Sequence, residues 1–301
     1  MKVAVLMSTY NGERFLREQL ESILDQMTDC QMDIWVRDDG SGDSTCKILE
    51  EYAEAGKLRW YSGENLKPAK SFLDLVKHCP GYDFYAFSDQ DDLWYPNKLQ
   101  EGIDRIRNQS CPAVSYANAQ LVDGELKSLG RNVYRNPSYV DFYSVVCGCN
   151  IMGCTMVFNH HLAKLIQDVP MPRELIMHDC YLAIVCTLYD GVILYDHAAC
   201  MDYRQHGNNV VGSAWKKTAA LKERFRRLTV KSTNTLDKMA ASICENYPCA
   251  PNTKKLRWLK SVSRYRESFF RAALLALDPK PTYNSWNMSI TLRLSMLFRN
   301  R

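Results

Sequence analysis

The chain has 301 residues, of which 46% are apolar and 24% are charged. This length and composition are those of a globular protein with one large core or two smaller ones, and they exclude a disordered or low-complexity chain. No run approaches the roughly 18 apolar residues of a membrane-spanning helix. The apolar run after Lys2 turns polar too soon for a signal peptide, so we expect a cytoplasmic protein.

The net charge of +4 is unevenly distributed along the chain. Residues 213–301 hold 19 Lys and Arg against 5 Asp and Glu, a net charge of +14, which leaves residues 1–212 with a net charge of −10. An acidic body followed by a basic region indicates two parts that face different partners, with a boundary at residues 212/213. The twelve cysteines form no Cys-x-x-Cys pair, so we expect reduced thiols that are mostly buried.

Short apolar runs alternate with amphipathic segments from the first residue onwards. The predicted elements are a strand at 2–7, a helix at 13–26, a strand at 33–37, a helix that ends near Gly56, a strand at 58–61, a helix at 69–78 and a strand at 83–87. Further strands are expected at 114–116, 155–158 and 192–195. This alternation predicts an α/β fold with a mainly parallel sheet.

Ligands of such sheets gather at the carboxyl ends of the strands, which selects the polar loops 8–12, 38–41 and 88–92. The last of them holds Asp89, Asp91 and Asp92 within four residues. Three carboxylates so close together repel one another, and their oxygens suit Mg²⁺ or Mn²⁺, so we expect a divalent cation there. The alternative is a solvated acidic turn in which Asp92 caps the following helix.

Six short motifs then stand in a particular order. They are Ser8-Thr9-Tyr10-Asn11-Gly12, Asp38-Asp39-Gly40-Ser41, Ser88-Asp89-Gln90-Asp91-Asp92-Leu93-Trp94, Gly153-Cys154-Thr155, His178-Asp179, and Tyr203-Arg204-Gln205-His206-Gly207-Asn208-Asn209. Over residues 1–212 the sequence resembles the family 2 glycosyltransferases with the GT-A (Rossmann-like) fold. More narrowly, it is similar to bacterial O-antigen and capsule enzymes described as rhamnosyl- or glucosyltransferases.

The resemblance implies a metal-dependent transfer of a sugar from a UDP- or dTDP-sugar to a saccharide, with inversion. On the donor side it implies that Asp39 accepts a hydrogen bond from the base, that Asp89 lies near the ribose, and that Asp91 binds the metal. Thr9 and Tyr10 would line the base pocket, Asn11 and Gln90 would lie beside the donor, and Lys70 would meet its phosphates. Thr9 as a helix cap and Lys70 as a solvated lysine remain alternatives.

The resemblance makes Asp179 the base that takes the proton of the acceptor hydroxyl. Because Asp179 also opens an apolar segment, an N-terminal helix cap is the alternative. His178 beside it is expected to orient or pack. The family usually has an aromatic residue where Cys180 stands, which puts the acceptor pocket in doubt.

The final motif contributes two further candidates. Arg204 could clamp the diphosphate, and His206 could complete the metal shell, with a purely structural role as the alternative for His206.

Residues 213–301 carry no catalytic motif, but basic segments with aromatic residues occur at 222–231 and 254–271, and the final stretch 286–298 is mostly apolar with Arg293 as its one cation. They favour either an anionic membrane surface or a helical hairpin packed on the catalytic domain. No nucleic-acid-binding motif is present. We therefore expect a lipid-linked saccharide acceptor at the inner face of the cytoplasmic membrane. A sugar nucleotidyltransferase and a non-catalytic scaffold of a membrane assembly are the two alternative functions.

Overall fold

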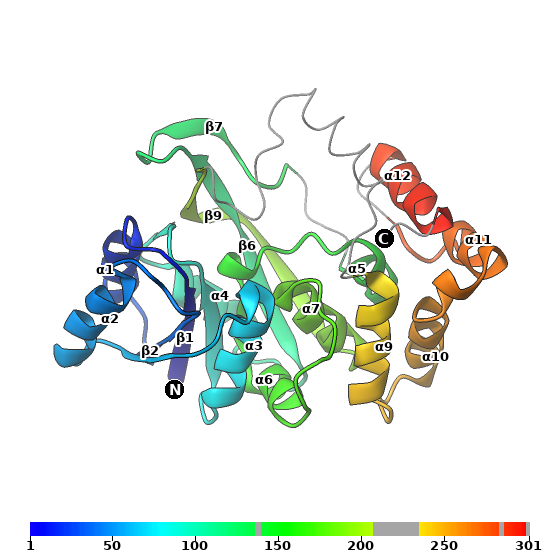
Figure 1. Ribbon diagram of the computed structural model, residues 1–301, viewed down its shortest axis with the longest axis horizontal. Helices are drawn as coiled ribbons and strands as arrows, with labels where there is room; N and C mark the ends of the chain where they lie inside the picture. Colours follow the sequence, from blue (N-terminus) through cyan, green and yellow to red (C-terminus); the bar gives the residue numbers. More distant parts are fainter. Residues whose placement is uncertain (136–139, 207–234, 283–285, 299–301) are drawn as a thin grey trace.

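Figure 1 shows the computed structural model, which describes residues 1–135, 140–206, 235–282 and 286–298. A nine-stranded sheet has the order β3-β2-β1-β4-β8-β6-β9-β5, with β7 paired to β6. The strands are β1 (Lys2–Thr9), β2 (Gln31–Asp38), β3 (Arg59–Ser62), β4 (Phe84–Ser88), β5 (Leu93–Trp94), β6 (Ala113–Val122), β7 (Ser128–Asn132), β8 (Val157–Asn159) and β9 (Val192–Arg204). The helices of the first 206 residues are α1 (Leu16–Leu24), α2 (Thr45–Glu54), α3 (Lys67–His78), α4 (Lys98–Ile106), α5 (Phe142–Gly148), the short 3-10 helix η1 (Gly153–Thr155), α6 (His160–Gln167) and α7 (His178–Leu188).

Strand β1 is buried on both faces and organises the sheet. Val3, Val5 and Met7 pack in one core with α1, α2 and α4, whereas Ala4 and Leu6 pack in the other with α3 and α7. This division follows from the two-residue period of a strand. Because β1 pairs in parallel with β2 and β4, the loops that follow these three strands emerge at one edge of the sheet.

The predicted α/β fold is confirmed, with differences in detail. The expected strand 155–158 corresponds to β8, which runs antiparallel to both β4 and β6, so the sheet is mixed although its N-terminal half is parallel. The expected strand 192–195 is only the start of β9, because Asp196 and His197 interrupt the apolar pattern without ending the strand. Helix α1 begins at Leu16 rather than at residue 13, since residues 10–15 form the loop above β1.

The helices after residue 234 continue the core of the sheet. They are α9 (Leu236–Asn246), α10 (Thr253–Val262), the 3-10 helix η2 (Tyr265–Glu267), α11 (Phe269–Leu277) and α12 (Trp286–Leu297). Apolar side chains of α9 and α10 share one cluster with α7, and the Tyr247 hydroxyl donates to the carbonyl of Leu165 at 3.1 Å. The predicted basic segment 222–231 and the boundary at 212/213 lie outside the described residues.

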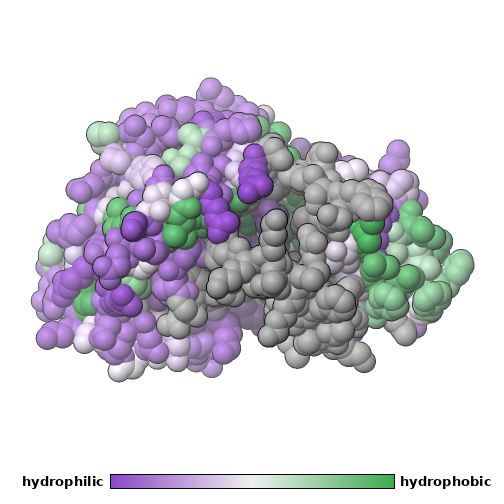
Figure 2. Space-filling model, turned by 90° about the horizontal axis from the view of Figure 1, so that it is seen from above, coloured by the Kyte–Doolittle hydropathy of each residue, from purple (hydrophilic) through white to green (hydrophobic). Residues whose placement is uncertain are grey.

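Helices α11 and α12 form the end of the molecule farthest from α1 and α2 (Figure 1). In Figure 2 hydrophobic side chains gather at this end, whereas the face over the sheet is mostly hydrophilic. None of the helices in the described part of the chain is long and apolar enough to cross a membrane.

Two leucines test whether the C-terminal helices fold together with the sheet. Leu259 on α10 is fully buried in the shared core, whereas Leu277 on α11 is 79% exposed. We expect Leu259→Ala to lower the free energy of unfolding by about 2–5 kcal/mol, because it leaves a cavity in the core. Leu277→Ala, the matched control, should change it by less than about 0.5 kcal/mol.

Urea unfolding followed by far-ultraviolet circular dichroism measures both variants. One transition that shifts as a whole in Leu259→Ala is the expected result. A separate early transition, with the main one left at its parental midpoint, would show that α9–α12 fold as an independent unit.

Candidate functional site

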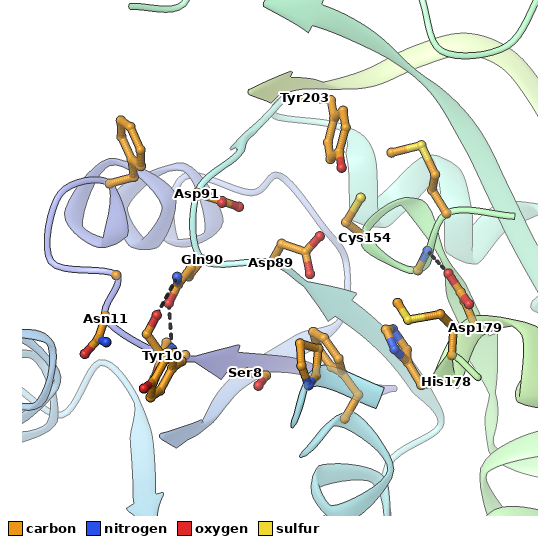
Figure 3. A pocket seen from close by; sticks show the side chains of 18 of the residues that line it. Ser8, Tyr10, Asn11, Asp89, Gln90, Asp91, Cys154, His178, Asp179 and Tyr203 are labelled. Atoms are coloured by element: carbon orange, nitrogen blue, oxygen red, sulfur yellow. Dashed lines mark hydrogen bonds between the residues drawn. The ribbon is translucent and has the colours of Figure 1, made fainter. Parts of the chain in front are cut away.

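A cavity of about 730 Å³ opens at the carboxyl ends of β1 and β4 (Figure 3). Its walls come from the loop after β1, the acidic turn after β4, the 3-10 helix η1, the start of α7 and the end of β9. The lining residues are Ser8, Thr9, Tyr10, Asn11, Gly12, Arg14, Phe15, Pro68, Phe72, Asp89, Gln90, Asp91, Met152, Gly153, Cys154, Met177, His178, Asp179, Tyr203 and His206.

The loop after β1 is held against the acidic turn by Gln90. The Gln90 side-chain oxygen accepts from the Tyr10 N–H at 2.9 Å, and its amide nitrogen donates to the Tyr10 carbonyl at 3.1 Å. A Cβ on Gly12 would lie 2.2 Å from the same Gln90 oxygen, so a larger residue there would displace the Gln90 side chain from the Tyr10 backbone. The Tyr10 ring is half exposed at the rim, and Asn11 adopts a φ of 49° with its side chain accepting from the Gly42 N–H.

The two carboxylates of the turn after β2 have different surroundings. Asp38 accepts hydrogen bonds from the Gly40 and Ser41 N–H groups and from the hydroxyls of Thr9 and Ser41, which accounts for the shape of the turn. Asp39 is buried in an ion pair with Arg37 and is not among the lining residues, although its N–H donates to the Thr9 carbonyl.

The acidic turn after β4 brings together the buried Asp92 and the half-buried Asp89 and Asp91. Burial, with the nearby Asp91 and Asp179 carboxylates, raises the pKa of Asp89 to about 7. Burial and the same Asp91 carboxylate raise the pKa of Asp92 well above its usual value. Asp92 Oδ1 accepts from the Arg204 N–H at 3.2 Å, while Oδ2 has no hydrogen-bond partner in the described residues. An uncompensated carboxylate of this kind favours a cation nearby.

Two groups of side chains could hold such a cation. His206 Nε2 lies 2.7 Å from Asp91 Oδ2 on the cavity wall, so the two predicted metal ligands are brought together. Ligand atoms of Asp89, Asp92 and Cys154 also lie within 4.8 Å of one another. Mg²⁺ and Mn²⁺ prefer carboxylate oxygens over a thiol, which favours the Asp91 side of the turn over the group with Cys154.

Asp179 faces the acidic turn from the start of α7 (Figure 3). Its Oδ2 accepts from the Gly153 N–H at 3.1 Å and its Oδ1 from the Cys180 N–H at 2.6 Å. The helix begins one residue earlier, at His178, so Asp179 lies in the first turn rather than at the cap position. The carboxylate therefore has a fixed orientation beside the cavity and lies where the helix dipole favours negative charge.

His178 packs between Asp179 and the core. Its ring stacks on Phe72 with centroids 4.2 Å apart and meets the edge of Phe87, and burial lowers its pKa to about 4. A Cβ on Gly153 would lie 2.4 Å from the His178 Nε2, so this glycine permits the close contact. The arrangement agrees with the orienting and packing role expected for His178.

Arg204 is buried away from the cavity and connects the segments around it. Its Nε donates to the Asp91 carbonyl at 2.9 Å, Nη1 to the Gly124 carbonyl at 2.8 Å and Nη2 to Glu18 at 2.6 Å. The guanidinium also lies 4.4 Å from the centre of the Phe15 ring. It thereby fixes the acidic turn against β9 and α1.

Eight of the eleven predicted site residues line the cavity, and three do not. Those that line it are Thr9, Tyr10, Asn11, Asp89, Gln90, Asp91, Asp179 and His206. Asp39 and Arg204 are buried behind the wall, and the Lys70 ammonium donates to the Arg173 carbonyl at 3.2 Å. Residues 207–209 of the final motif lie outside the described residues.

The sequence reasoning did not select Arg14, Phe72, Met152, Met177 and Tyr203, which also line the cavity. Among the described lining residues, only Arg14 carries a permanent positive charge, and its guanidinium carbon lies 4.7 Å from the centre of the Phe15 ring. Two of these residues stand beside a motif: Arg14 follows Gly12 by two positions, and Tyr203 opens the last motif. Met152 and Met177 lack any pattern that separates them from core residues.

The comparisons with known proteins all indicate the same protein family. The model of Glycosyl transferase family 2 matches residues 4–163. The chain is 30% identical over 239 residues to dTDP-rhamnosyl transferase RfbG of Shigella flexneri, an alignment that covers 74% of this chain and 78% of the relative. It is 25% identical over 160 residues to UDP-Glc:alpha-D-GlcNAc-diphosphoundecaprenol beta-1,3-glucosyltransferase WfgD of Escherichia coli, covering 53% of this chain and 61% of the relative.

Solved structures resemble the whole chain. S. aureus TarS 1-349 in complex with UDP-GlcNAc superposes with a TM-score of 0.56 at 17% identity, covering 99% of this chain and 90% of that one. Mannosyltransferase PcManGT from Pyrobaculum calidifontis, in complex with GDP-Man and Mn²⁺, gives a TM-score of 0.54 at 16% identity, covering 99% and 86%. These likenesses confirm the GT-A α/β fold.

The contacts of Arg204 and Arg14 predict that only the loss of Arg204 lowers the stability. Arg204→Met removes three side-chain hydrogen bonds from a buried position, so we expect it to lower the free energy of unfolding by about 2 kcal/mol or more. Arg14→Met, at an exposed position, should leave it within about 0.5 kcal/mol of the parent. Thermal and urea unfolding of the two variants measure the difference, and equal stabilities would contradict the structural role of Arg204.

Proposed function

The chain belongs to glycosyl transferase family 2, and we propose that it transfers a sugar from a UDP- or dTDP-sugar to a hydroxyl of a saccharide during cell-surface polysaccharide synthesis. The observation that carries this proposal is the single cavity that holds both the acidic turn with Asp91 and His206 and, opposite it, the fixed carboxylate of Asp179. The family membership argues against the alternative of a sugar nucleotidyltransferase. A non-catalytic scaffold would have no use for these carboxylates in one cavity.

On the donor side we propose that the nucleotide lies along the loop after β1. Thr9, Tyr10 and Asn11 would contact the base and ribose, with Gln90 fixing the loop from below and Asp89 near the ribose. Asp39 would accept a hydrogen bond from the base; Arg37 already supplies the counter-charge that this buried carboxylate needs. For the diphosphate the positions favour Arg14 over Lys70 and Arg204, because Arg14 alone of the three faces the cavity.

The residues present fit a divalent cation. Burial and the neighbouring carboxylates raise the pKa of Asp89, and one Asp92 oxygen has no hydrogen-bond partner in the described residues, so a bound cation would stabilise the ionised carboxylates. We propose that Asp91 and His206 hold Mg²⁺ or Mn²⁺. When bound, the cation would offset the charge of the diphosphate leaving group.

Asp179 is proposed to act as the base of an inverting transfer. The acceptor oxygen forms a bond to the anomeric carbon while the bond from that carbon to the donor phosphate breaks, and the hydroxyl proton passes to Asp179. The N–H groups of Gly153 and Cys180 hold the carboxylate in place. The nucleoside diphosphate leaves with the electron pair of the broken bond.

The acceptor we propose is a lipid-linked saccharide at the inner face of the cytoplasmic membrane. The WfgD relative is named for a GlcNAc-diphosphoundecaprenol, which supports this class of acceptor. The basic C-terminal region would then bring the enzyme to the membrane surface as a peripheral protein.

Loss of one carboxylate tests the cation site. We expect Asp91→Asn to weaken Mn²⁺-dependent binding of dTDP or UDP by about 10- to 100-fold or more, since a ligand is removed. The measurement is the rise in melting temperature caused by the nucleotide with and without Mn²⁺. Asp168→Asn, a largely exposed carboxylate at the end of α6, is the matched control and should behave as the parent. Parental metal dependence in Asp91→Asn would contradict the assignment.

The role of Asp179 can be separated from a structural one. If it is the base, Asp179→Asn should slow transfer by about 10²- to 10⁴-fold while nucleotide binding stays near parental. If it is structural, the main effect should be on stability, because Gly153 and Cys180 donate to different oxygens of Asp179 and the amide places an NH2 donor at one of these two positions. Transfer rates and urea unfolding are therefore measured on the same preparation. Near-parental transfer by a folded Asp179→Asn protein would contradict the catalytic role of Asp179.

A further inference from the structure

Exposed apolar side chains gather on one end of the molecule. Of the eleven large hydrophobic residues that are exposed in the described part of the chain, seven lie between residues 269 and 298. They are Phe269, Phe270, Leu274, Leu277, Ile290, Leu294 and Phe298, which we call the apolar surface. Figure 2 shows hydrophobic atoms gathered at this end of the molecule.

The spacing of these residues makes a continuous face. Phe270, Leu274 and Leu277 follow one another by four and three positions along α11, and Ile290 and Leu294 are four positions apart on α12, with Phe298 four positions further on, directly after the helix end. Such spacings place side chains on one side of a helix. The two helices are tied together by Arg293, whose Nη1 donates to the carbonyls of Ala276 and Asp278 at 2.6 and 2.8 Å.

This face is additional to the one that packs on the protein. Ala272, Leu275 and Ala276 of α11 are already buried in the shared core. Phe270 is 71% exposed and Leu277 is 79% exposed on the outer side, where a helix of a globular protein normally carries polar residues. An apolar face of this size commonly marks an interaction site.

Cations border the apolar surface. Residues 253–277 contain seven Lys and Arg and a single Glu. Arg264 and Arg271 share that Glu267, and Lys260 has no ion pair with a carboxylate of the described residues. A cleft of about 380 Å³ between α10 and α11 is lined by Lys260, Arg264 and Arg271 together with Leu274, so charge and apolar area adjoin.

We propose that α10, α11 and α12 dock on an anionic lipid bilayer, with the apolar surface inserted among the acyl chains and Lys260, Arg264 and Arg271 at the phosphates. A bilayer satisfies both features at once, since its headgroups accept the cations and its interior accepts Phe and Leu. A second copy of the chain would bring like charges together around the same apolar face. The proposal rests on the proposed function in one respect: a lipid-linked acceptor would lie at such a membrane surface.

Insertion and electrostatic attraction respond differently to salt. Salt screens the cations over about 8–10 Å at physiological strength but leaves apolar burial in place. Binding to anionic vesicles should therefore weaken in high salt without disappearing. A basic region that binds through charge alone would be released completely.

The test is co-sedimentation of the full chain with vesicles of phosphatidylethanolamine and phosphatidylglycerol, with phosphatidylcholine vesicles as the neutral comparison. We expect Phe270→Ser combined with Leu277→Ser to lower the partition coefficient at least tenfold and to abolish the salt-resistant part. Lys260→Gln combined with Arg271→Gln should lower only the salt-sensitive part. Met27→Ser combined with Leu129→Ser, exposed apolar residues on the other half of the molecule, is the matched control and should bind as the parent.

Each variant is first shown to keep the parental melting temperature and nucleotide-induced shift. Parental partitioning by the Phe270→Ser, Leu277→Ser protein would overturn the proposal. The proposal would also be overturned if light scattering showed the parent to be a dimer and the Phe270→Ser, Leu277→Ser protein to be a monomer. A second copy of the chain would then cover the apolar surface. Sugar transfer to a water-soluble saccharide, assayed without vesicles, reports on the proposed function separately: its absence with intact vesicle binding would overturn only the function.

Discussion

Repulsion among the carboxylates after β4 is the constraint on which the rest of the site depends. Three aspartates within four residues at the end of a buried strand can be held together only if their surroundings compensate them. Arg204 contributes a backbone N–H to Asp92 and a guanidinium to the Asp91 carbonyl, and His206 meets Asp91 directly. The compensation is incomplete, as the unpartnered Asp92 oxygen shows. The charge that is left unmet is what makes the turn suited to the proposed cation, which would in turn attract a diphosphate.

The sheet topology places these carboxylates at the wall of the cavity. Parallel pairing of β1 with β2 and β4 brings three polar loops to one edge, and Gln90 fastens the first loop to the third. Lys98, whose ammonium lies 3.1 Å from the centre of the Trp94 ring, is buried beneath the acidic turn, and burial lowers its pKa to about 8. Charge of both signs is thus packed under the turn. Burial of these charges is unfavourable, and the burial of apolar side chains in the two cores on either face of β1 offsets its free-energy cost.

The sequence was sufficient for the features that depend on local order. The alternation of apolar strands and amphipathic helices predicted the sheet, and of the three loops that the strand-end rule selected, 8–12 and 88–92 contribute to the cavity wall whereas 38–41 lies behind it. The sequence did not reveal the position of a long side chain for which several partners were within reach. Arg204 and Lys70 were expected at the diphosphate, but the guanidinium of Arg204 contacts Glu18 and two carbonyls, and Lys70 contacts a carbonyl near α7. The partners of Arg204 and Lys70 are far from them in the sequence, so these contacts depend on tertiary packing and not on local sequence.

Helix α7 connects the two ends of the molecule. Its first turn carries Asp179, while its buried face joins α9 and α10 in one core that extends to Ala272 and Ala276 of α11. The helices that carry the apolar surface are therefore packed on the same core that positions the proposed base, with no separate core between them. If α11 and α12 rest on a bilayer, the orientation of the cavity relative to that bilayer is set by this packing. An acceptor whose lipid remains in the membrane would then meet Asp179 in a restricted range of directions, which would make the C-terminal helices part of acceptor selection.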